Sequence, residues 1–171
     1  MFKFEFMNLD GISLYKRSVK FSIAMNKAEK CLNSPEFSEF FLNKDFTQLG
    51  EFSGRDKKDL LNLLLRPVYC DYYVIPRPWY KRFSSVIGWT AFTKKFLFSI
   101  GWKSIAQVST YVDQFDAMSV AGLAGHLVHE IACHGNGFSH SYKWVKERDD
   151  SIPYSVGNYV ESWVSKSNNN P

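Results

Sequence analysis

The sequence predicts an α+β fold in a single domain, and three observations support this prediction. Apolar residues recur at helical spacing towards both ends of the chain, whereas the middle is rich in β-branched and aromatic residues. The length of 171 residues is close to that of one domain. Hydrophobic residues make up 45% and charged residues 22%, so the chain can bury a core and is not of the disordered class. The expected order is N-terminal helices, a small mixed β-sheet, a long helix and a C-terminal helix.

Three helices are predicted before the sheet. In residues 18–32, four apolar side chains recur at helical spacing, namely Phe21, Met25, Ala28 and Leu32. Ser34 followed by Pro35 is typical of a helix start, because a serine side chain can cap the first turn and proline fits its first position. Residues 56–65 form the third predicted helix, which Pro67 ends.

The sheet is predicted from three segments that are rich in β-branched and aromatic residues: 68–75, 85–92 and 95–102. A loop joins the first two segments. Between Arg77 and Arg82 this loop is both basic and aromatic, with the sequence Arg-Pro-Trp-Tyr-Lys-Arg. Residues 77–82 are therefore a candidate surface for binding a partner.

A long helix is predicted from about residue 116 to residue 134, because four apolar residues fall on one face: Val120, Leu123, Leu127 and Ile131. Gly135 follows as a natural helix stop. A final helix is predicted for residues 153–164. The short polar tail at residues 165–171 is expected to be frayed.

Composition and charge argue against several classes of protein. Twenty-one Lys and Arg against 17 Asp and Glu give a net charge of +4, which is too small to indicate nucleic-acid binding by itself. Among the first thirty residues, charged residues interrupt every apolar run before it reaches the length of a signal peptide. No apolar run in the sequence reaches the length of a membrane span. Three widely spaced cysteines favour a reducing compartment. We therefore expect a soluble, cytoplasmic protein that does not span a membrane.

All four histidines lie within residues 126–140, at positions 126, 129, 134 and 140. Imidazole is the commonest protein ligand of catalytic metals, and residues 104–142 contain no Lys or Arg to compete with a cation. A catalytic zinc site needs three protein ligands and one open position for water. The histidine cluster therefore predicts a metal site.

The spacing of the cluster is that of a known motif with one extra residue. His129 and Glu130 are followed by His134, Gly137 and His140, which gives HExxxHxxGxxH. This run of about twelve residues resembles the metzincin branch of the zincin metallopeptidases, whose motif is HExxHxxGxxH. The resemblance implies a zincin-like single domain over residues 1–171, a zinc ion held by the three histidines, Glu130 as general base, and an edge strand that pairs with an extended peptide.

The extra residue lies between Glu130 and His134. In a regular α-helix, positions 129 and 134 differ by about 140° around the axis and do not share a face. A one-residue π-bulge would bring them together, and π-bulges are frequent at functional sites. The dipeptidyl peptidase III group, which carries an HExxxH helix, is a precedent for the longer spacing. Gly137 is expected to allow a tight left-handed turn that returns His140 to the metal.

Two other residues compete for a place at the metal. Cys133 lies four residues after His129, where a regular helix would put the second ligand. His134 is the favoured ligand, because only from His134 does the spacing to Gly137 and His140 follow the motif. His126 lies about 60° from His129 around the helix, which leaves three roles open to it: a hydrogen-bond donor to a ligand, an alternative ligand, or a core or surface histidine unrelated to the metal.

The chain departs from the metzincin pattern at the methionine turn that underlies the zinc. No methionine follows Met118, and residues 151–154 stand where that turn is expected. Tyr154, the last of these, is predicted to face the metal as a tyrosine does in some members of the family. The simpler interpretation is that Tyr154 is a packed aromatic residue in the first turn of the last helix.

The predicted function is that of a zinc-dependent metallopeptidase with one Zn²⁺ per chain and a peptide or protein as substrate. Glu130 would take a proton from the attacking water, and Tyr154 would help to stabilise the oxyanion. Strand 95–102 or its neighbour would present its edge to the substrate. The alternative is a metal-containing binding module without catalysis, which would bind a peptide or nucleic acid through residues 77–82. Glu130 argues against it, because a structural zinc site needs no carboxylate beside its first ligand.

Overall fold

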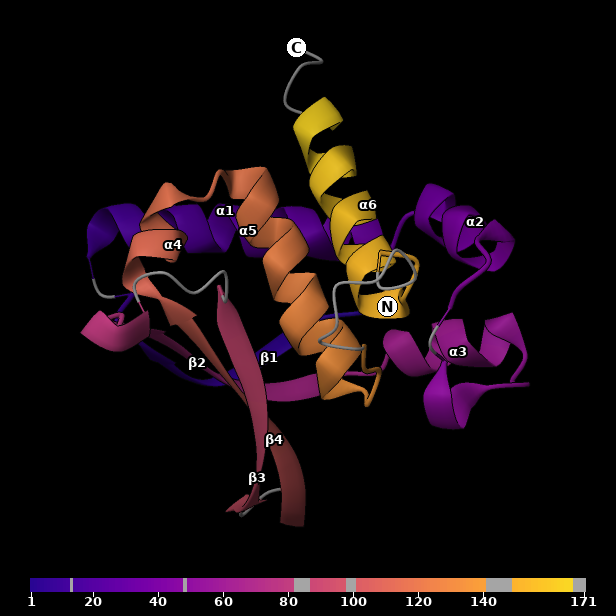
Figure 1. The fold of residues 1–171 in the computed structure, drawn as a ribbon, viewed down its shortest axis with the longest axis horizontal. Helices are drawn as coiled ribbons and strands as arrows, with labels where there is room; N and C mark the ends of the chain where they lie inside the picture. Colours follow the sequence, from indigo (N-terminus) through magenta and orange to yellow (C-terminus); the bar gives the residue numbers. More distant parts are fainter. Residues whose placement is uncertain (13, 48, 82–86, 98–100, 141–148, 168–171) are drawn as a thin grey trace.

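The computed structural model describes residues 1–12, 14–47, 49–81, 87–97, 101–140 and 149–167. The described part is an α+β fold, which confirms the predicted fold class (Figure 1). Its sheet has four strands in the order β1-β2-β4-β3. Their bounds are β1 Phe4–Asp10, β2 Val68–Ile75, β3 Gly88–Leu97 and β4 Gly101–Tyr111.

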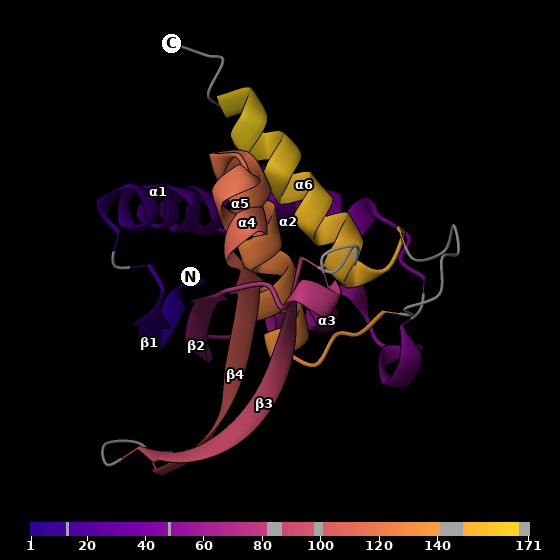
Figure 2. The ribbon, with the colours of Figure 1, turned by 60° about the vertical axis from the view of Figure 1, so that its left-hand side comes forward.

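The sheet is mixed, as predicted, and β3 is its antiparallel edge. β1 pairs with β2 and β2 with β4 in parallel, whereas β3 runs antiparallel to β4. Residues 106–110 of β4 have β2 on one side and β3 on the other. Residues 101–105 of β4 pair with β3 alone, so this end of the hairpin projects beyond the sheet (Figure 2).

The predicted bounds of the last two strands were wrong. The break predicted between 85–92 and 95–102 lies inside β3, which continues to Leu97, and β4 extends to Tyr111. Polar residues in the middle of β3 suggested the break, but a strand continues as long as its backbone remains paired. Residues 85–86 and 98–100 of these predictions lie outside the described part of the chain.

Strand β1 is not among the predicted elements. Its Phe4 pairs with Val68 of β2, more than sixty positions along the chain. A parallel pair needs a long connection, and here three helices supply it. The core side of β2 consists of alternate buried residues: Val68, Cys70, Tyr72 and Val74.

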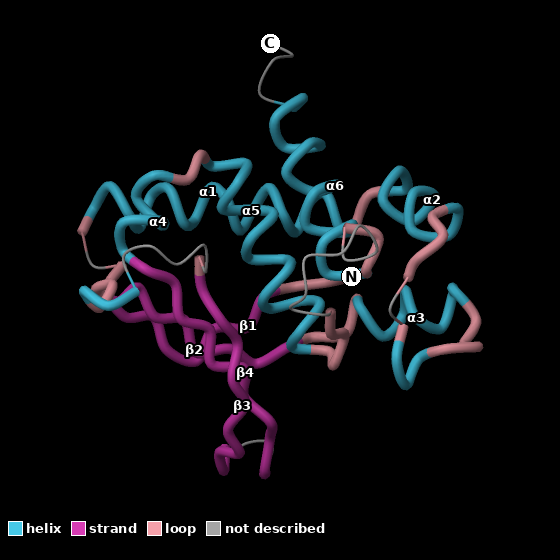
Figure 3. Tube along the Cα trace, in the orientation of Figure 1, coloured by secondary structure: helices cyan, strands magenta, loops and turns pink. Residues whose placement is uncertain are grey.

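The N-terminal helices begin and end close to their predicted positions. α1 spans Tyr15–Leu32, α2 spans Pro35–Asn43 and α3 spans Lys57–Leu64. Ser34 caps α2 as expected, because its Oγ accepts a hydrogen bond of 3.1 Å from the backbone N–H of Phe37. Short 3₁₀ turns occur at Gly50–Phe52 and Trp79–Lys81. Helices α1, α5 and α6 pack against one another beside the sheet (Figure 3).

The predicted helix 116–134 is divided. α4 spans Val112–Ala117, and α5 spans Val120–Leu127 after a break at which the Ser119 side chain caps the backbone N–H of Gly122. The last helix, α6, spans Ile152–Ser167. It therefore continues through residues 165–167, which were expected to be frayed, while residues 168–171 lie outside the described part. Among the described residues no helix is long and apolar enough to cross a membrane.

Helices α5 and α6 cross at a pair of glycines. A Cβ atom on Gly125 would lie 2.6 Å from the carbonyl oxygen of Gly157 and 3.1 Å from Cβ of Glu161. A Cβ atom on Gly157 would lie 3.3 Å from Cβ of His129. The two glycines therefore set how closely α6 approaches the turn of helix that carries His129.

We expect Gly125→Ala to destabilise the protein by about 1–3 kcal/mol, because the new methyl group overpacks the helix crossing. Gly122→Ala is the matched control on the same helix. Its new methyl group would have no neighbour closer than 3.5 Å, so the higher helix propensity of alanine should raise stability by up to about 1 kcal/mol. Thermal unfolding of the two metal-free variants measures both effects. Equal melting temperatures would show that the crossing tolerates a methyl group.

Candidate metal centre

A π-helical segment continues α5 and carries the first two histidines. It spans Val128–His134, where the sequence analysis predicted a π-bulge. The wider turn moves His134 back to the side of the helix that His129 occupies. Their ring centroids lie 5.0 Å apart, although the two residues are five positions apart. The extra residue of the motif is therefore absorbed in the helix.

The turn after the helix returns His140 to the same place. Gly137 has φ +91°, the left-handed conformation that was predicted for it. The backbone N–H of Gly137 bonds the carbonyl of His134, and that of Phe138 bonds the carbonyl of Cys133. Gly135, the predicted stop, lies at the helix end in a right-handed conformation. Glycine suits this position because a Cβ would meet Val68 at 2.5 Å.

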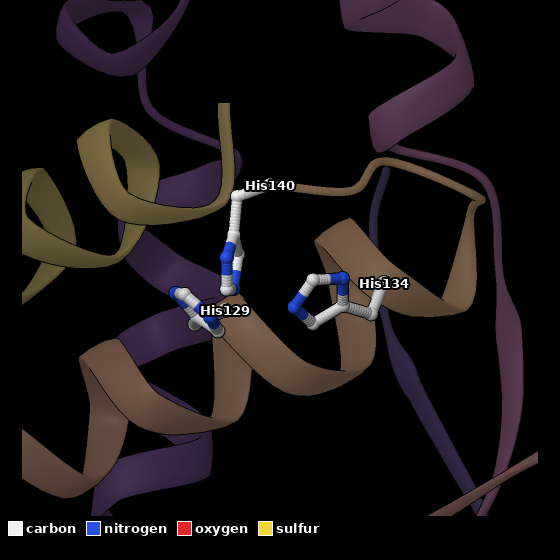
Figure 4. A group of neighbouring side chains, drawn as sticks. All are labelled: His129, His134 and His140. Carbon is white, nitrogen blue, oxygen red and sulfur yellow. The ribbon is translucent and has the colours of Figure 1, made fainter. Parts of the chain in front are cut away.

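His129, His134 and His140 form a triad that could hold a metal ion. One possible ligand atom of each residue lies within 4.8 Å of the corresponding atoms of the other two. Figure 4 shows the rings turned towards a common space, two from the helix and one from the segment after it. The ring of His140 has its centroid 5.2 Å from that of His129 and 5.1 Å from that of His134.

Backbone carbonyls orient two of the three rings. Nδ1 of His134 lies 2.6 Å from the carbonyl oxygen of Phe138, so Nδ1 carries the proton and Nε2 keeps its lone pair for a metal. The ring of His129 has a hydrogen bond with the backbone of Pro153 at the start of α6. Hydrogen bonds of this kind hold metal-binding histidines in one tautomer and one orientation.

Burial also favours the neutral form of these rings. It lowers the pKa of His129 well below the ordinary value, and the neighbouring histidines lower it further. Burial lowers the pKa of His134 too, although the hydrogen bond to Phe138 acts in the opposite direction. A neutral imidazole is the form that binds a metal. The site is therefore ready for a cation at neutral pH.

Cys133 does not join the histidine triad. Its side chain is fully buried, and burial raises the pKa of the thiol well above its ordinary value. A protonated thiol in an apolar environment is a poor metal ligand. Between the two residues considered for the second position, the structure therefore brings His134 to the cluster and leaves Cys133 in the core.

His126 points towards the sheet and is not part of the triad. Its Nε2 lies 2.8 Å from the hydroxyl of Thr110, which lies 2.9 Å from the hydroxyl of Tyr72. This buried chain of polar groups joins β2, β4 and α5. The described contacts of His126 therefore support neither a role as a metal ligand nor a role as a hydrogen-bond donor to a ligand.

The carboxylate of Glu130 lies against the edge strand. The residue is only 8% exposed, and its Oε2 accepts a hydrogen bond of 2.6 Å from the hydroxyl of Thr90 on β3. The same hydroxyl lies 3.1 Å from the backbone carbonyl oxygen of Glu130. The sequence analysis did not single out Thr90, because nothing near it in the sequence relates it to a residue forty positions away.

Tyr154 lies beside the triad, as predicted. It belongs to the first turn of α6, and its ring centroid is 4.7 Å from that of His129 and 4.7 Å from that of His140. The segment at residues 151–154 thus brings an aromatic ring to the triad. Tyr154 is both a packed aromatic residue of the helix and a neighbour of two candidate ligands.

The basic loop at residues 77–82 is partly engaged with its own protein. Arg77 lies over the ring of Tyr111 and pairs with Asp113 at 3.0 Å. Lys81 lies over the ring of Trp89. The exposed residues in the described part of this loop are Trp79, Tyr80 and Lys81. Arg82 lies outside the described residues.

Comparison with known proteins leaves the family open: no family model matches the chain, and no match is found among curated proteins or solved structures. What stands is the geometry of the site. Three imidazole rings converge, and backbone groups orient two of them. The buried carboxylate of Glu130 follows the first of these histidines in the chain, and the ring of Tyr154 lies beside two of them.

Proposed function

We propose that this protein is a zinc-dependent peptidase of the zincin type, with one zinc ion per chain bound by His129, His134 and His140. The observation that carries the proposal is the convergence of these three rings, although the interval between His129 and His134 is one residue longer than in the HExxH motif. A chance cluster of histidines would not require a π-helical segment at the point of insertion. Glu130, next to the first ligand, supplies the one further group that hydrolysis needs.

The donor set fits zinc. Three imidazole nitrogens with one open position are a common arrangement in zinc hydrolases. Tetrahedral zinc with bonds of about 2.0–2.1 Å places its ligand nitrogens about 3.4 Å apart. The separations here do not exceed 4.8 Å, so a small inward rotation of the rings is sufficient. Among the described residues no fourth side chain joins the triad, and an open position for water favours a catalytic over a structural site.

Glu130 is the general base of the proposed reaction. When bound, zinc would supply Lewis-acid chemistry, which makes water more acidic and polarises a carbonyl group. The carboxylate of Glu130 accepts the proton of the attacking water and then delivers it to the leaving amine. With Oε2 held by Thr90, Oε1 is the oxygen that carries this proton. The ring of Tyr154 lies beside two of the candidate ligands, which supports a role for its hydroxyl as a hydrogen-bond donor to the oxyanion.

The substrate is an extended peptide that adds to the edge of β3. Among the described strands β3 pairs with β4 alone, so its other edge is open to a further strand. The hydrogen bonds between Thr90 and Glu130 place this edge beside the candidate site. Phe92 lies two residues beyond Thr90 and is 55% exposed, so it offers an apolar surface to a substrate side chain.

Metal analysis together with a cleavage assay tests this proposal. The purified protein should contain about one zinc per chain and cleave an unstructured protein such as casein. Treatment with 1,10-phenanthroline should abolish cleavage, and added zinc should restore it, because the open coordination position is needed for activity.

Two results would contradict the proposal in different ways. If the protein took up no zinc from a micromolar solution, the three histidines would not form a zinc site. A zinc-loaded protein that cleaves no member of a broad peptide library would instead be a metal-containing binding module.

A further inference from the structure

Glu130 lies in the π-helical segment and is only 8% exposed, so its polar atoms need partners within the protein. Its carboxylate and its backbone carbonyl both lie within hydrogen-bond distance of one side chain outside the helix. That side chain is Thr90 of the edge strand β3. A buried carboxylate or carbonyl without a donor is destabilising.

The hydroxyl of Thr90 lies between two oxygens of Glu130. It lies 3.1 Å from the Glu130 carbonyl and 2.6 Å from Oε2 of the same residue. Thr90 pairs with Val108 in the sheet, and Val108 is fully buried, so both side chains face the helices. One hydroxyl on the edge strand therefore contacts both the backbone carbonyl and the carboxylate of Glu130.

From this we infer that Thr90 is a positioning residue for Glu130. Its hydroxyl contacts the backbone carbonyl of Glu130 and holds the carboxylate in one orientation. This inference rests on the proposed function, in which Glu130 is the base. Thr90 has one hydroxyl hydrogen for two acceptors, and the shorter distance and the negative charge favour the carboxylate.

The contact also couples the substrate edge to the base. Thr90 belongs to the strand with which an extended peptide would pair, and its side chain leads directly to Glu130. A displacement of about 1 Å in a catalytic group is enough to reduce a rate about 100-fold. Holding the carboxylate from the edge strand keeps its distance from a bound peptide constant.

Kinetics of three variants tests the inference in the zinc-loaded protein. Thr90→Val keeps the shape but removes the hydroxyl, so kcat should fall about 10- to 100-fold while KM and zinc content remain unchanged. Thr90→Ser keeps the hydroxyl and should retain kcat within about threefold. Ser109→Ala, on the opposite face of the sheet, controls for loss of a hydroxyl from β4 and should behave as wild type. Equal kcat in Thr90→Val and Thr90→Ser would overturn the inference.

Stability of the metal-free protein gives a readout that does not depend on activity. Thr90→Val should lower the melting temperature by about 3 °C or more, because it leaves buried acceptors without a donor, and Thr90→Ser should not. In a Glu130→Ala background the loss should be smaller but not zero, because the carbonyl remains. The same loss in both backgrounds would show that the hydroxyl does not hold the carboxylate. A wild type without hydrolytic activity would refute the proposed function, while this stability cycle would still decide whether the Thr90 contact exists.

Discussion

Replacing His134 by alanine is expected to weaken zinc binding by at least about 100-fold, whereas replacing Cys133 by alanine should leave zinc binding unchanged. Zinc sites with four protein ligands bind with about 10–16 kcal/mol, so each ligand contributes roughly 3 kcal/mol, or about 100-fold in Kd. The ring of His134 faces the other two candidate ligands, while the thiol of Cys133 is buried in the core and burial raises its pKa. Competition with a zinc chelator of known affinity measures both Kd values.

The two variants form a matched pair, because they alter neighbouring residues of the same π-helical segment. Cys133→Ala removes a buried sulfur and should cost some stability without changing the metal affinity. If Cys133→Ala lost zinc and His134→Ala kept it, the HExxC alternative would be correct and the π-helical alignment would not describe the metal-bound state. His140→Ala should lose zinc as His134→Ala does, because it removes the ligand that the Gly137 turn supplies.

Glu130→Gln should retain zinc and fold normally while losing nearly all hydrolysis. The amide has the volume of the carboxylate and can still accept the hydrogen bond of Thr90, but it cannot take a proton from water. Loss of a general base typically reduces the rate about 10²- to 10⁴-fold. The loss should fall on kcat more than on KM, because the proton is transferred only as the transition state is reached.

Casein cleavage by wild type and Glu130→Gln, with zinc content measured in the same samples, provides the comparison. Equal turnover by the two proteins would exclude Glu130 as the base. A loss of zinc from Glu130→Gln would make the carboxylate a structural partner of the site rather than the base. Thr90→Val should show a smaller loss of kcat than Glu130→Gln, because it displaces the carboxylate without removing it.

The geometry of the metal site was largely predictable from a short stretch of sequence. The five-residue interval between His129 and His134 required a wider helical turn, and the π-helical segment provides it. Gly137 was expected to reverse the chain and does so with φ +91°. These features are local: hydrogen bonds span at most five residues, and the reversal depends on the φ preference of one glycine. Local preferences are therefore sufficient to bring His140 back to the helix.

The sheet was less predictable, and the errors in its predicted strands have one cause. Strand β1 was not predicted, and the bounds of β3 and β4 were wrong, although the strand character of the region was correct. A strand lasts as long as its partner does, and the partner of β1 lies more than sixty residues away. Composition shows that a segment can form a strand, but only the pairing decides where it begins and ends.

The sequence by itself determined the α+β fold class, the helix that carries the histidines, the π-helical turn within it and the return of His140. Only the tertiary structure decided what surrounds these groups. It decided between the alternatives that the sequence left open for Tyr154 and Cys133, with Tyr154 beside two of the rings and Cys133 in the core, and it brought Thr90 of the edge strand to Glu130. The physical reason is the separation along the chain over which each interaction acts. Helical spacing and glycine conformation act within a few residues, whereas these contacts join segments separated by up to forty positions and exist only once the sheet and helices have packed together.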